Sequence, residues 1–465
     1  MKKMNLFTLW IISWFGVFFV GTLSMIFAQP SSAQVYFLDA LNGNDANIGD
    51  SDHPWRTIAR ALPDWAGVGT KVTQGDTVLI SPGNYGRFYY QDSTSTTRSD
   101  WITYRAKDIK NMPIFQNVSI YNTPKVYMRF EYLDIRDTNS SAAFHAVGKL
   151  DVHQQNIQIK NCVFVYSSYH RTAVNLLYSD NTVVEDCNIT NCGYGVLVQF
   201  SDYATIRNNN IHHPDADGIR FDSSSHLQIE GNHIHDLWRN ERNATVHIDF
   251  LQIISWSANS VHDVNIIKNV MHTGESQGIH CTTSADCYSS NILVENNLLY
   301  GPFGGSQIDF TNVHGLTFVN NTVIGSNGIG SSIGVGCTNV RIHNNIFAHT
   351  MFSNSGNPNT NEQNYNIFSK YSAIKNPLGA HDLISANIGF VDADNNDFAL
   401  APGSVAIDFG NPDFGPVSDI LGHSRTGRPD AGCYEFVEPK RQDYLFSGDV
   451  NITAMPGTRI IIEVK

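Results

Sequence analysis

An apolar stretch near the middle of the chain is interrupted by polar side chains, since residues 247–253 read HIDFLQI. Leu251 and Ile253 suit a strand that faces a core, whereas Asp249 and Gln252 could hold a ligand or move a proton. Comparable triplets, in which two apolar residues flank a third residue, recur along the chain. Because successive side chains of a strand point to opposite faces, the middle residue of each triplet should face solvent. The predicted outward series is Asn175, Leu197, Arg220, Gln252, His280, Asp309 and Gly334, with His145 as a candidate first member.

A second series lies three residues upstream of the first and consists of Tyr194, Asp217, Asp249, Gln277 and Ser306. Strict alternation would turn these side chains inward, so we predict a bend, which Gly218 would permit after Asp217. If the triplets stack as adjacent strands about 4.8 Å apart, the four residues from Arg220 to Asp309 form a strip roughly 15 Å long, or about three sugar units.

Carboxylates, an imidazole and a cation on adjacent strands can perform acid–base chemistry, and two reactions of sugars use such groups. In glycoside hydrolysis, one carboxylate protonates the leaving oxygen and a second activates water or attacks carbon, roles that Asp217 and Asp249 could fill. In β-elimination, a base such as His280 or Arg220 removes the proton beside a uronate carboxylate while a cation neutralises that carboxylate. A Ca²⁺ ion held by Asp217 and Asp249 could be that cation. The same proton abstraction would begin an epimerisation. The alternative is an ordinary polar strand face.

The segment 235–248, HDLWRNERNATVHI, is longer than the corresponding connections elsewhere and would form a wall beside the strip. Trp238 could stack on a sugar ring, and Arg239 and Arg242 could bind carboxylates of the substrate, again as neutralising cations. His247 lies where this segment rejoins the strand, and it is a further catalytic candidate. The alternative is a tolerated loop without a function.

Eight segments share one pattern of apolar and polar residues: NIQIKNCVF, NTVVEDCNI, YATIRNNNI, HLQIEGNHI, DVNIIKNVM, NILVENNLL, GLTFVNNTV and NVRIHNNIF. They recur at a period of about two dozen residues, with strand-like alternation and without a leucine consensus, which indicates short strands in stacked coils. One column holds Cys162, Cys187, Asn209, Asn232, Asn269, Asn297, Asn321 and Asn345. Asparagines in register can form a ladder in which each amide bonds to the next coil, so we predict an all-β, right-handed parallel β-helix of about ten coils.

With these repeats the chain resembles the pectin-lyase-like β-helix superfamily. Residues 36–62 with 75–85, and residues 401–411 with 427–436, are similar to the opening and closing segments of many secreted β-helix proteins. The resemblance implies a short N-terminal capping helix at about residues 56–65, which would cover the first coil. The expected organisation is a signal peptide (1–33), a cap with the first coils (34–110), the β-helix (111–400), a closing segment (401–440) and a small β tail (441–465).

Residues 215–234 resemble the catalytic coil of polygalacturonase-like glycoside hydrolases, in which an Asp belongs to a carboxylate group and a Gly makes a bend. This resemblance implies that Asp217 is a candidate acid, with Asp249 one coil further along. HHPDAD (212–217) is similar to a motif of alginate epimerases. Because the fold hosts lyases, hydrolases, epimerases and binding proteins, the architecture alone does not select an activity.

The ends and the overall charge bear on the compartment and the partner. The N-terminus combines MKKMN, an apolar run (6–27) and small residues before Gln34, which is typical of a secretory signal cleaved after Ala33. An uncleaved membrane anchor is the alternative, because the run is long enough to span a bilayer. A formal charge of −13 without a basic stripe argues against nucleic acid as a partner. The seven cysteines do not indicate a disulfide scaffold, although Cys281 and Cys287 could close a short loop.

We therefore expect a secreted (extracellular or periplasmic) monomer that degrades an acidic or uronate-containing polysaccharide, most simply as a lyase, with Ca²⁺ as the one candidate cofactor. A polygalacturonase-like hydrolase and a non-catalytic carbohydrate-binding or adhesion protein are the alternatives. The catalytic candidates are Asp217, Arg220, Asp249, His280 and His247. The substrate-binding candidates are Gln252, Asp309, Trp238, Arg239, Arg242 and Asn175.

Overall fold

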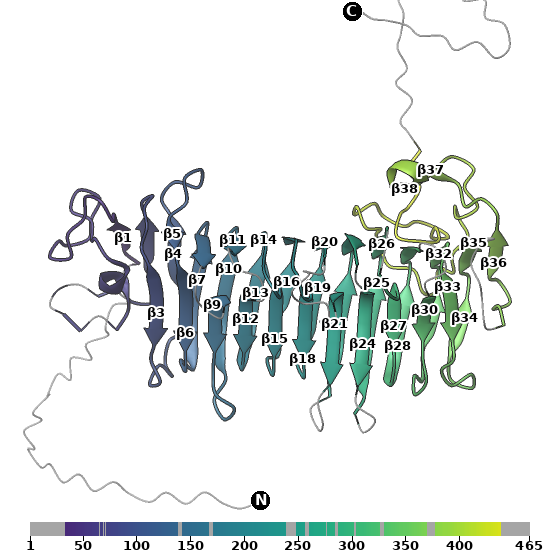
Figure 1. The fold of residues 1–465 in the computed structure, drawn as a ribbon, viewed down its shortest axis with the longest axis horizontal. Helices are drawn as coiled ribbons and strands as arrows, with labels where there is room; N and C mark the ends of the chain where they lie inside the picture. The colour runs from purple at the N-terminus through teal and green to yellow at the C-terminus, as the bar shows by residue number, and fades with distance from the viewer. Residues whose placement is uncertain are drawn as a thin grey trace, which may run out of the picture.

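The computed structural model describes residues 33–438 apart from 65, 68, 70, 138–141, 167–170, 239–247, 256–259, 276, 284–286, 302–303, 326–329 and 370–376. In this range the chain winds into stacked coils, and successive strands of a coil join three different parallel sheets (Figure 1). In one coil, for example, β18 (Ile219–Asp222), β19 (Leu227–Glu230) and β20 (His233–Leu237) lie in different sheets. The chain then returns as β21 (Asp249–Ser255) beside β18. The predicted parallel β-helix is confirmed.

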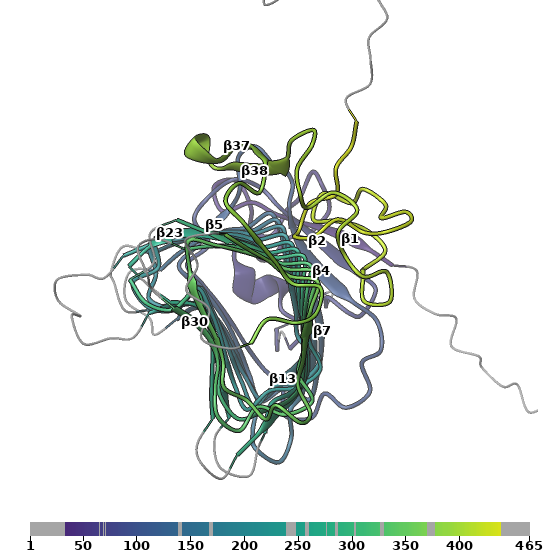
Figure 2. The same ribbon diagram turned by 90° about the vertical axis from the view of Figure 1, so that its right-hand side faces the viewer.

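The three sheets form the three sides of the solenoid, as the view along its axis shows (Figure 2). Sheet A has 13 strands, in spatial order β1 (Val35–Leu38), β2 (Thr77–Ile80), β4 (Ile102–Ala106), β7 (Lys125–Glu131), β10 (Gln154–Lys160), β13 (Ser179–Glu185), β16 (Thr205–Arg207), β19, β22 (His262–Ile267), β25 (Ser289–Glu295), β28 (Val313–Val319), β31 (Arg341–His343) and β34 (Glu362–Asn364).

Sheet B has 12 strands: β5 (Ile114–Phe115), β8 (Asp134–Asp137), β11 (Val163–Tyr166), β14 (Asn188–Thr190), β17 (Asn210–His212), β20, β23 (Val270–Gly274), β26 (Leu298–Tyr300), β29 (Thr322–Ile324), β32 (Ile346–Ala348), β35 (Ile367–Ser369) and β36 (Leu383–Ser385). Sheet C has 11 strands: β3 (Arg87–Gln91), β6 (Asn117–Tyr121), β9 (Ala142–Val147), β12 (Thr172–Leu177), β15 (Val196–Gln199), β18, β21, β24 (Gln277–Thr283), β27 (Ile308–Phe310), β30 (Gly330–Ile333) and β33 (Met351–Asn354).

The core is a continuous stack of apolar side chains enclosed by the three sheets. On sheet C, alternation along the strands places the apolar pair of each triplet inside, so that Ile219, Leu251, Ile279 and Ile308 are fully buried in one column. All seven cysteines are buried, and none of them forms a disulfide bond. The short loop closure that we considered between Cys281 and Cys287 is therefore not formed.

The predicted asparagine ladder lies inside the corner between sheets A and B. Asn232 Nδ2 donates to Asn269 Oδ1 at 3.0 Å, and Asn269 Nδ2 donates to Asn297 Oδ1 at 3.0 Å. Each of these oxygens also accepts the backbone N–H of the preceding ladder residue at 2.9 Å. The pattern extends from Asn209 to Asn366, and Cys187 joins it through its backbone N–H. The ladder thus pairs polar groups that no water reaches.

The N-terminal cap contains less helix than we predicted. One 3-10 turn, η1 (Ile58–Ala61), stands where a capping helix was expected, and Trp65 lies outside the described residues. Trp55 is fully buried and stacks on Tyr36 of β1 at 4.7 Å between ring centroids. β1 pairs directly with β2, so the cap is continuous with sheet A.

At the other end, an antiparallel pair of β37 (Phe390–Asp392) and β38 (Asp397–Leu400), separated by η3 (Ala393–Asn395), leads into residues 401–438. This closing segment folds back along the outside of the last coils (Figure 1). Lys268 Nζ donates to Ser418 Oγ at 2.9 Å, and Asn320 Nδ2 donates to the Asp430 carbonyl at 2.8 Å.

The predicted signal peptide, apart from Ala33, and the predicted tail lie outside the described residues. In the part of the chain that is described, no helix has the length and apolar character needed to cross a membrane.

Replacing Asn269 by Ala should lower the free energy of unfolding by about 3 kcal/mol. The substitution leaves the buried backbone N–H of Asn232 and the carbonyl of Ile229 without their partners, at roughly 1–3 kcal/mol for each group. Urea unfolding followed by circular dichroism measures the loss. Asn265→Ala is the matched control, because Asn265 lies on the outer face of β22, four residues before Asn269, and its Nδ2 donates to Gln228 Oε1. Equal losses for the two variants would contradict a special role for the ladder.

Candidate functional site

The outer face of sheet C carries the predicted outward series in register. Arg220 pairs with Gln252, Gln252 with His280, and His280 with Asp309. Towards the N-terminus the same column continues through Leu197 and Asn175 to His145, as the triplets indicated. We refer to Arg220, Gln252, His280 and Asp309, which lie on four consecutive strands, as the sheet C strip.

The last predicted member of the series is wrong. Asp309 pairs with Ser332, not with Gly334, and Ser332 Oγ donates to Asp309 Oδ1 at 2.6 Å. The inward residue that precedes it is Ser331, which is buried and hydrogen-bonds to Gln307 Oε1 at 3.3 Å. Because a serine fills this core position, the apolar pair that marks the other triplets is missing here. The sequence alignment therefore placed this triplet two residues too far along the chain.

Arg220 is held in place by carboxylates. Its Nε donates to Asp222 Oδ1 at 2.9 Å, its Nη1 lies 3.8 Å from Asp217 Oδ2, and its guanidinium lies over the ring of Tyr194. Burial alone would lower the pKa of Arg220, but the hydrogen bond and the charge of Asp222, followed by the charge of Asp217, raise it above its usual value. Arg220 is therefore a permanent cation, which argues against the base role that we considered for it.

Asp217 and Asp249 are close together, as predicted, but they lie inside the protein. The backbone N–H of Asp249 donates to Asp217 Oδ1 at 2.9 Å. Asp217 is 1% exposed and Asp249 is 0% exposed. Gly218 is required for space: a Cβ there would lie 2.6 Å from Ile234 Cγ2 and 2.7 Å from the Phe250 carbonyl oxygen. The expected bend that would turn both carboxylates outward is thus replaced by a close approach of adjacent coils.

A calcium ion fits these two carboxylates poorly. Ca²⁺ takes six to eight oxygen ligands, whereas one Asp217 oxygen already accepts a backbone N–H and the other faces the Arg220 guanidinium. We therefore assign no step of the proposed chemistry to calcium.

His280 and Asp309 are the two residues of the strip best suited to transfer a proton. His280 Nδ1 lies 3.5 Å from Asp309 Oδ2, and their side chains are 14% and 30% exposed. Gln252, on the strand before His280, is 7% exposed, and Asn175 lies further along the same face half-buried. The strip thus presents one imidazole–carboxylate pair and, two strands away, one fixed cation.

Only part of the predicted wall can be placed. Trp238 directly follows β20 and is 44% exposed. Arg239, Arg242 and His247 lie outside the described residues. Their assignment as substrate-binding and catalytic residues remains a prediction.

A second regular surface, which the sequence reasoning missed, is the corner where the chain passes from sheet C to sheet A. One residue per coil adopts a left-handed conformation there, and the pairing of the following strands puts these residues in one column. The column comprises Asn181, Tyr203, His226, Asp263, Asn291, Gly315 and Asn339. Asn, Asp and Gly tolerate this conformation best, so a search for Asn, Asp and Gly at the repeat period could have found the corner.

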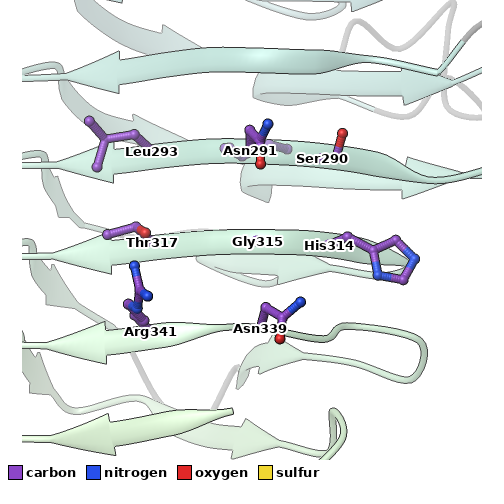
Figure 3. A pocket seen from close by; sticks show the side chains of 9 residues that line it. Ser290, Asn291, Leu293, His314, Gly315, Thr317, Asn339 and Arg341 are labelled. Carbon is purple, nitrogen blue, oxygen red and sulfur yellow. The ribbon is translucent and has the colours of Figure 1, made fainter. Parts of the chain in front are cut away.

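Two surface hollows lie along this corner. One, of about 390 Å³, is lined by Tyr178, Phe200, Asp202 and His262 among others, and its two aromatic rings stack at 5.3 Å. The other, of about 540 Å³, is lined by Asn291, His314 and Arg341, which come from three adjacent strands of sheet A or the turns before them (Figure 3).

The outer face of sheet B carries a column of stacked rings that we call the imidazole ladder. His212 stacks on His235 at 5.3 Å, His235 on His272 at 5.2 Å, and His272 on Tyr300 at 4.7 Å. His233 Nε2 lies 2.7 Å from His272 Nε2. Each ladder residue directly follows the last residue of an aligned repeat segment, so extending that alignment by one position would have revealed the column.

Comparison with known proteins agrees with this fold. Residues 150–323 match the family model described as a right handed beta helix region. A solved structure described as XylC in complex with xylose has a TM-score of 0.55 and 11% identity, and the alignment covers 86% of this chain and 98% of that one. Pectate lyase Pel9A has a TM-score of 0.49 and 16% identity, with 87% and 97% coverage. No curated protein sequence matches the chain. The chain thus has the fold of a right-handed parallel β-helix.

The imidazole ladder should make stability depend on pH. Burial, followed by the charges of neighbouring imidazoles, lowers the pKa of His212 below 6.5 and lowers the pKa of His272 to about 4. In the unfolded chain these histidines have the ordinary pKa of 6.5, so between pH 6.5 and about 4 the unfolded chain binds more protons than the folded one. The free energy of unfolding therefore has its full value above pH 6.5 and falls as the pH drops towards about 4. Thermal unfolding across this range measures the effect.

His272→Asn should reduce that pH-dependent loss, because it removes the imidazole whose pKa is lowered most. The matched control is His53→Asn, since the His53 side chain is 63% exposed and far from the ladder in sequence. If His272→Asn left the pH dependence unchanged, the ladder would not be its source.

Proposed function

We propose that this chain is a secreted enzyme that cleaves a uronate-containing polysaccharide by β-elimination on the outer face of sheet C. The observation that carries the proposal is the His280–Asp309 pair, which lies in register with Arg220 on the outer face of sheet C. Xylose in the complex with XylC, a protein of the same fold, shows that a sugar binds a protein of this architecture, which supports a carbohydrate ligand.

His280 is the proposed base. Asp309 Oδ2 lies near its Nδ1, which favours a proton on that nitrogen and leaves Nε2 to accept a proton from the substrate. The negative charge of Asp309 also stabilises the imidazolium that forms. In the reaction, the C5–H bond of the uronate gives its proton to Nε2 and the C4–O bond breaks. A double bond forms between C4 and C5, and the departing oxygen takes a proton from the imidazolium or from water.

Arg220 is the proposed anchor for a substrate carboxylate. It lies two strands from His280, about 10 Å along the strip, so it would bind the carboxylate of a sugar near the one that reacts. Its planar guanidinium can bind a carboxylate with two hydrogen bonds, and Asp222 fixes its orientation. Arg239 and Arg242 remain the candidates for neutralising the reacting uronate.

Hydrolysis is the second candidate, and the burial of its carboxylates makes it weaker. The pair that would serve as acid and base or nucleophile, Asp217 and Asp249, is at most 1% exposed. On the strip itself, Asp309 is the one carboxylate. A glycoside hydrolase needs two carboxyl groups flanking the scissile bond.

Replacing His280 by Ala should lower turnover of a uronate polysaccharide by at least about 100-fold, because proton abstraction loses its base. Purified protein is incubated with a panel of polysaccharides, while the ultraviolet absorbance of unsaturated sugar ends and the appearance of reducing ends are both recorded. Thermal unfolding should change little. His53→Ala, at an exposed site outside the strip, should retain full activity.

Other outcomes of this assay decide between the alternatives. Reducing ends without new absorbance would indicate hydrolysis. Retention in polysaccharide affinity gels without any turnover would indicate a non-catalytic binding protein. Activity that EDTA abolishes and Ca²⁺ restores would contradict a mechanism without calcium.

A further inference from the structure

Three metal-ligating side chains meet at the corner between sheets C and A. His262 Nδ1 lies 2.9 Å from Asp263 Oδ2, and His226 Nδ1 lies 3.3 Å from the same oxygen. One ligand atom from each residue lies within 4.8 Å of the other two. Among the described residues, this is the one group of three or more His, Cys, Asp or Glu side chains with that property.

The fold holds these residues at neighbouring positions. His226 and Asp263 occupy equivalent turn positions on adjacent coils, both with φ of 56°, and Leu227 after the first pairs with Val264 after the second. The backbone N–H of His226 donates to the His262 carbonyl at 2.9 Å. Tyr203, at the same position one coil earlier, stacks on His226 at 4.6 Å and orients its ring.

The distances suit a four-coordinate metal ion. Zinc bonds of 2.0–2.1 Å to histidine nitrogen and of similar length to carboxylate oxygen place tetrahedral ligand atoms about 3.3 Å apart. The two contacts of Asp263 Oδ2 lie close to this value.

The ligand types select the class of ion. Imidazole nitrogen suits Zn²⁺ and other transition metals, whereas Ca²⁺ and Mg²⁺ require a shell made mostly of oxygen. Two histidines and one carboxylate supply three ligands, which leaves one position of a tetrahedral site open. All three residues are partly exposed, so an ion could enter from solvent.

We propose that His226, His262 and Asp263 bind a divalent transition-metal ion of the zinc class, with one coordination position open to solvent. The site lies between the two hollows of the corner, because His262 lines one of them and Asn291, which lines the other, donates to Asp263 Oδ1 at 3.0 Å. A molecule that bridges the hollows could occupy the open position. The site lies outside the sheet C strip and does not depend on the proposed lyase activity.

Zinc titration of the full chain after removal of metals tests the proposal. Binding is measured by competition with a chromogenic chelator. The background carries His212→Asn, His233→Asn and His272→Asn, which removes both close imidazole pairs on the outer face of sheet B, His212–His213 and His233–His272. Asp263→Asn and His262→Ala should each weaken Zn²⁺ binding at least about tenfold. Asn tolerates the left-handed conformation of residue 263, so Asp263→Asn should fold normally.

His314→Asn is the matched control, because His314 lies on the same corner, two coils from Asp263 and three coils from His226. It should leave Zn²⁺ affinity unchanged, and Ca²⁺ should not compete for the site. Cobalt(II) should give the strong visible absorption of a four-coordinate complex in the parent background and lose it in Asp263→Asn. Equal Zn²⁺ affinity of the parent and Asp263→Asn, or no binding by the parent, would overturn the assignment.

Discussion

The asparagine amides in the corner between sheets A and B impose the constraint on which the rest of the structure depends. Each buried amide needs partners in both neighbouring coils: Asn269, for example, donates to the Ile229 carbonyl on one side and to Asn297 on the other. A slip of one residue would leave such groups unpaired in an apolar interior and would also turn every core side chain outward. The ladder therefore fixes one register for all three sheets.

That register makes neighbours of side chains that are two dozen or more residues apart in sequence. It survives even the 37-residue step from Asn232 to Asn269, because the extra length lies between strands and not within them. The sheet C strip, the three metal-ligating residues and the imidazole ladder consequently share the same few coils around β18 to β27 and face three different directions. One repeated backbone thus presents three independent surfaces.

The periodic features of this molecule could be predicted from the sequence, and the features that break or extend the period could not. Apolar pairs such as Leu251 and Ile253 revealed the outward face of sheet C, but Ser331 in the core hid the register of β30. Asp217 and Asp249 were found to be neighbours, yet their burial depends on how closely the backbone of one coil approaches the next at Gly218. His226 and Asp263 meet through a turn conformation that apolar alternation does not report.

The closing segment changes how this solenoid can come apart. In a stack of coils each unit ordinarily contacts only its neighbours, so unfolding can start at either end and spread one coil at a time. Here residues 401–438 bond to Lys268, Asn296, Asn320 and Asn344, which hold the same turn position on four consecutive coils. We expect those four coils to unfold together as one cooperative unit. Unfolding one coil at a time should then begin at the N-terminal coils, where no such segment crosses the described turns.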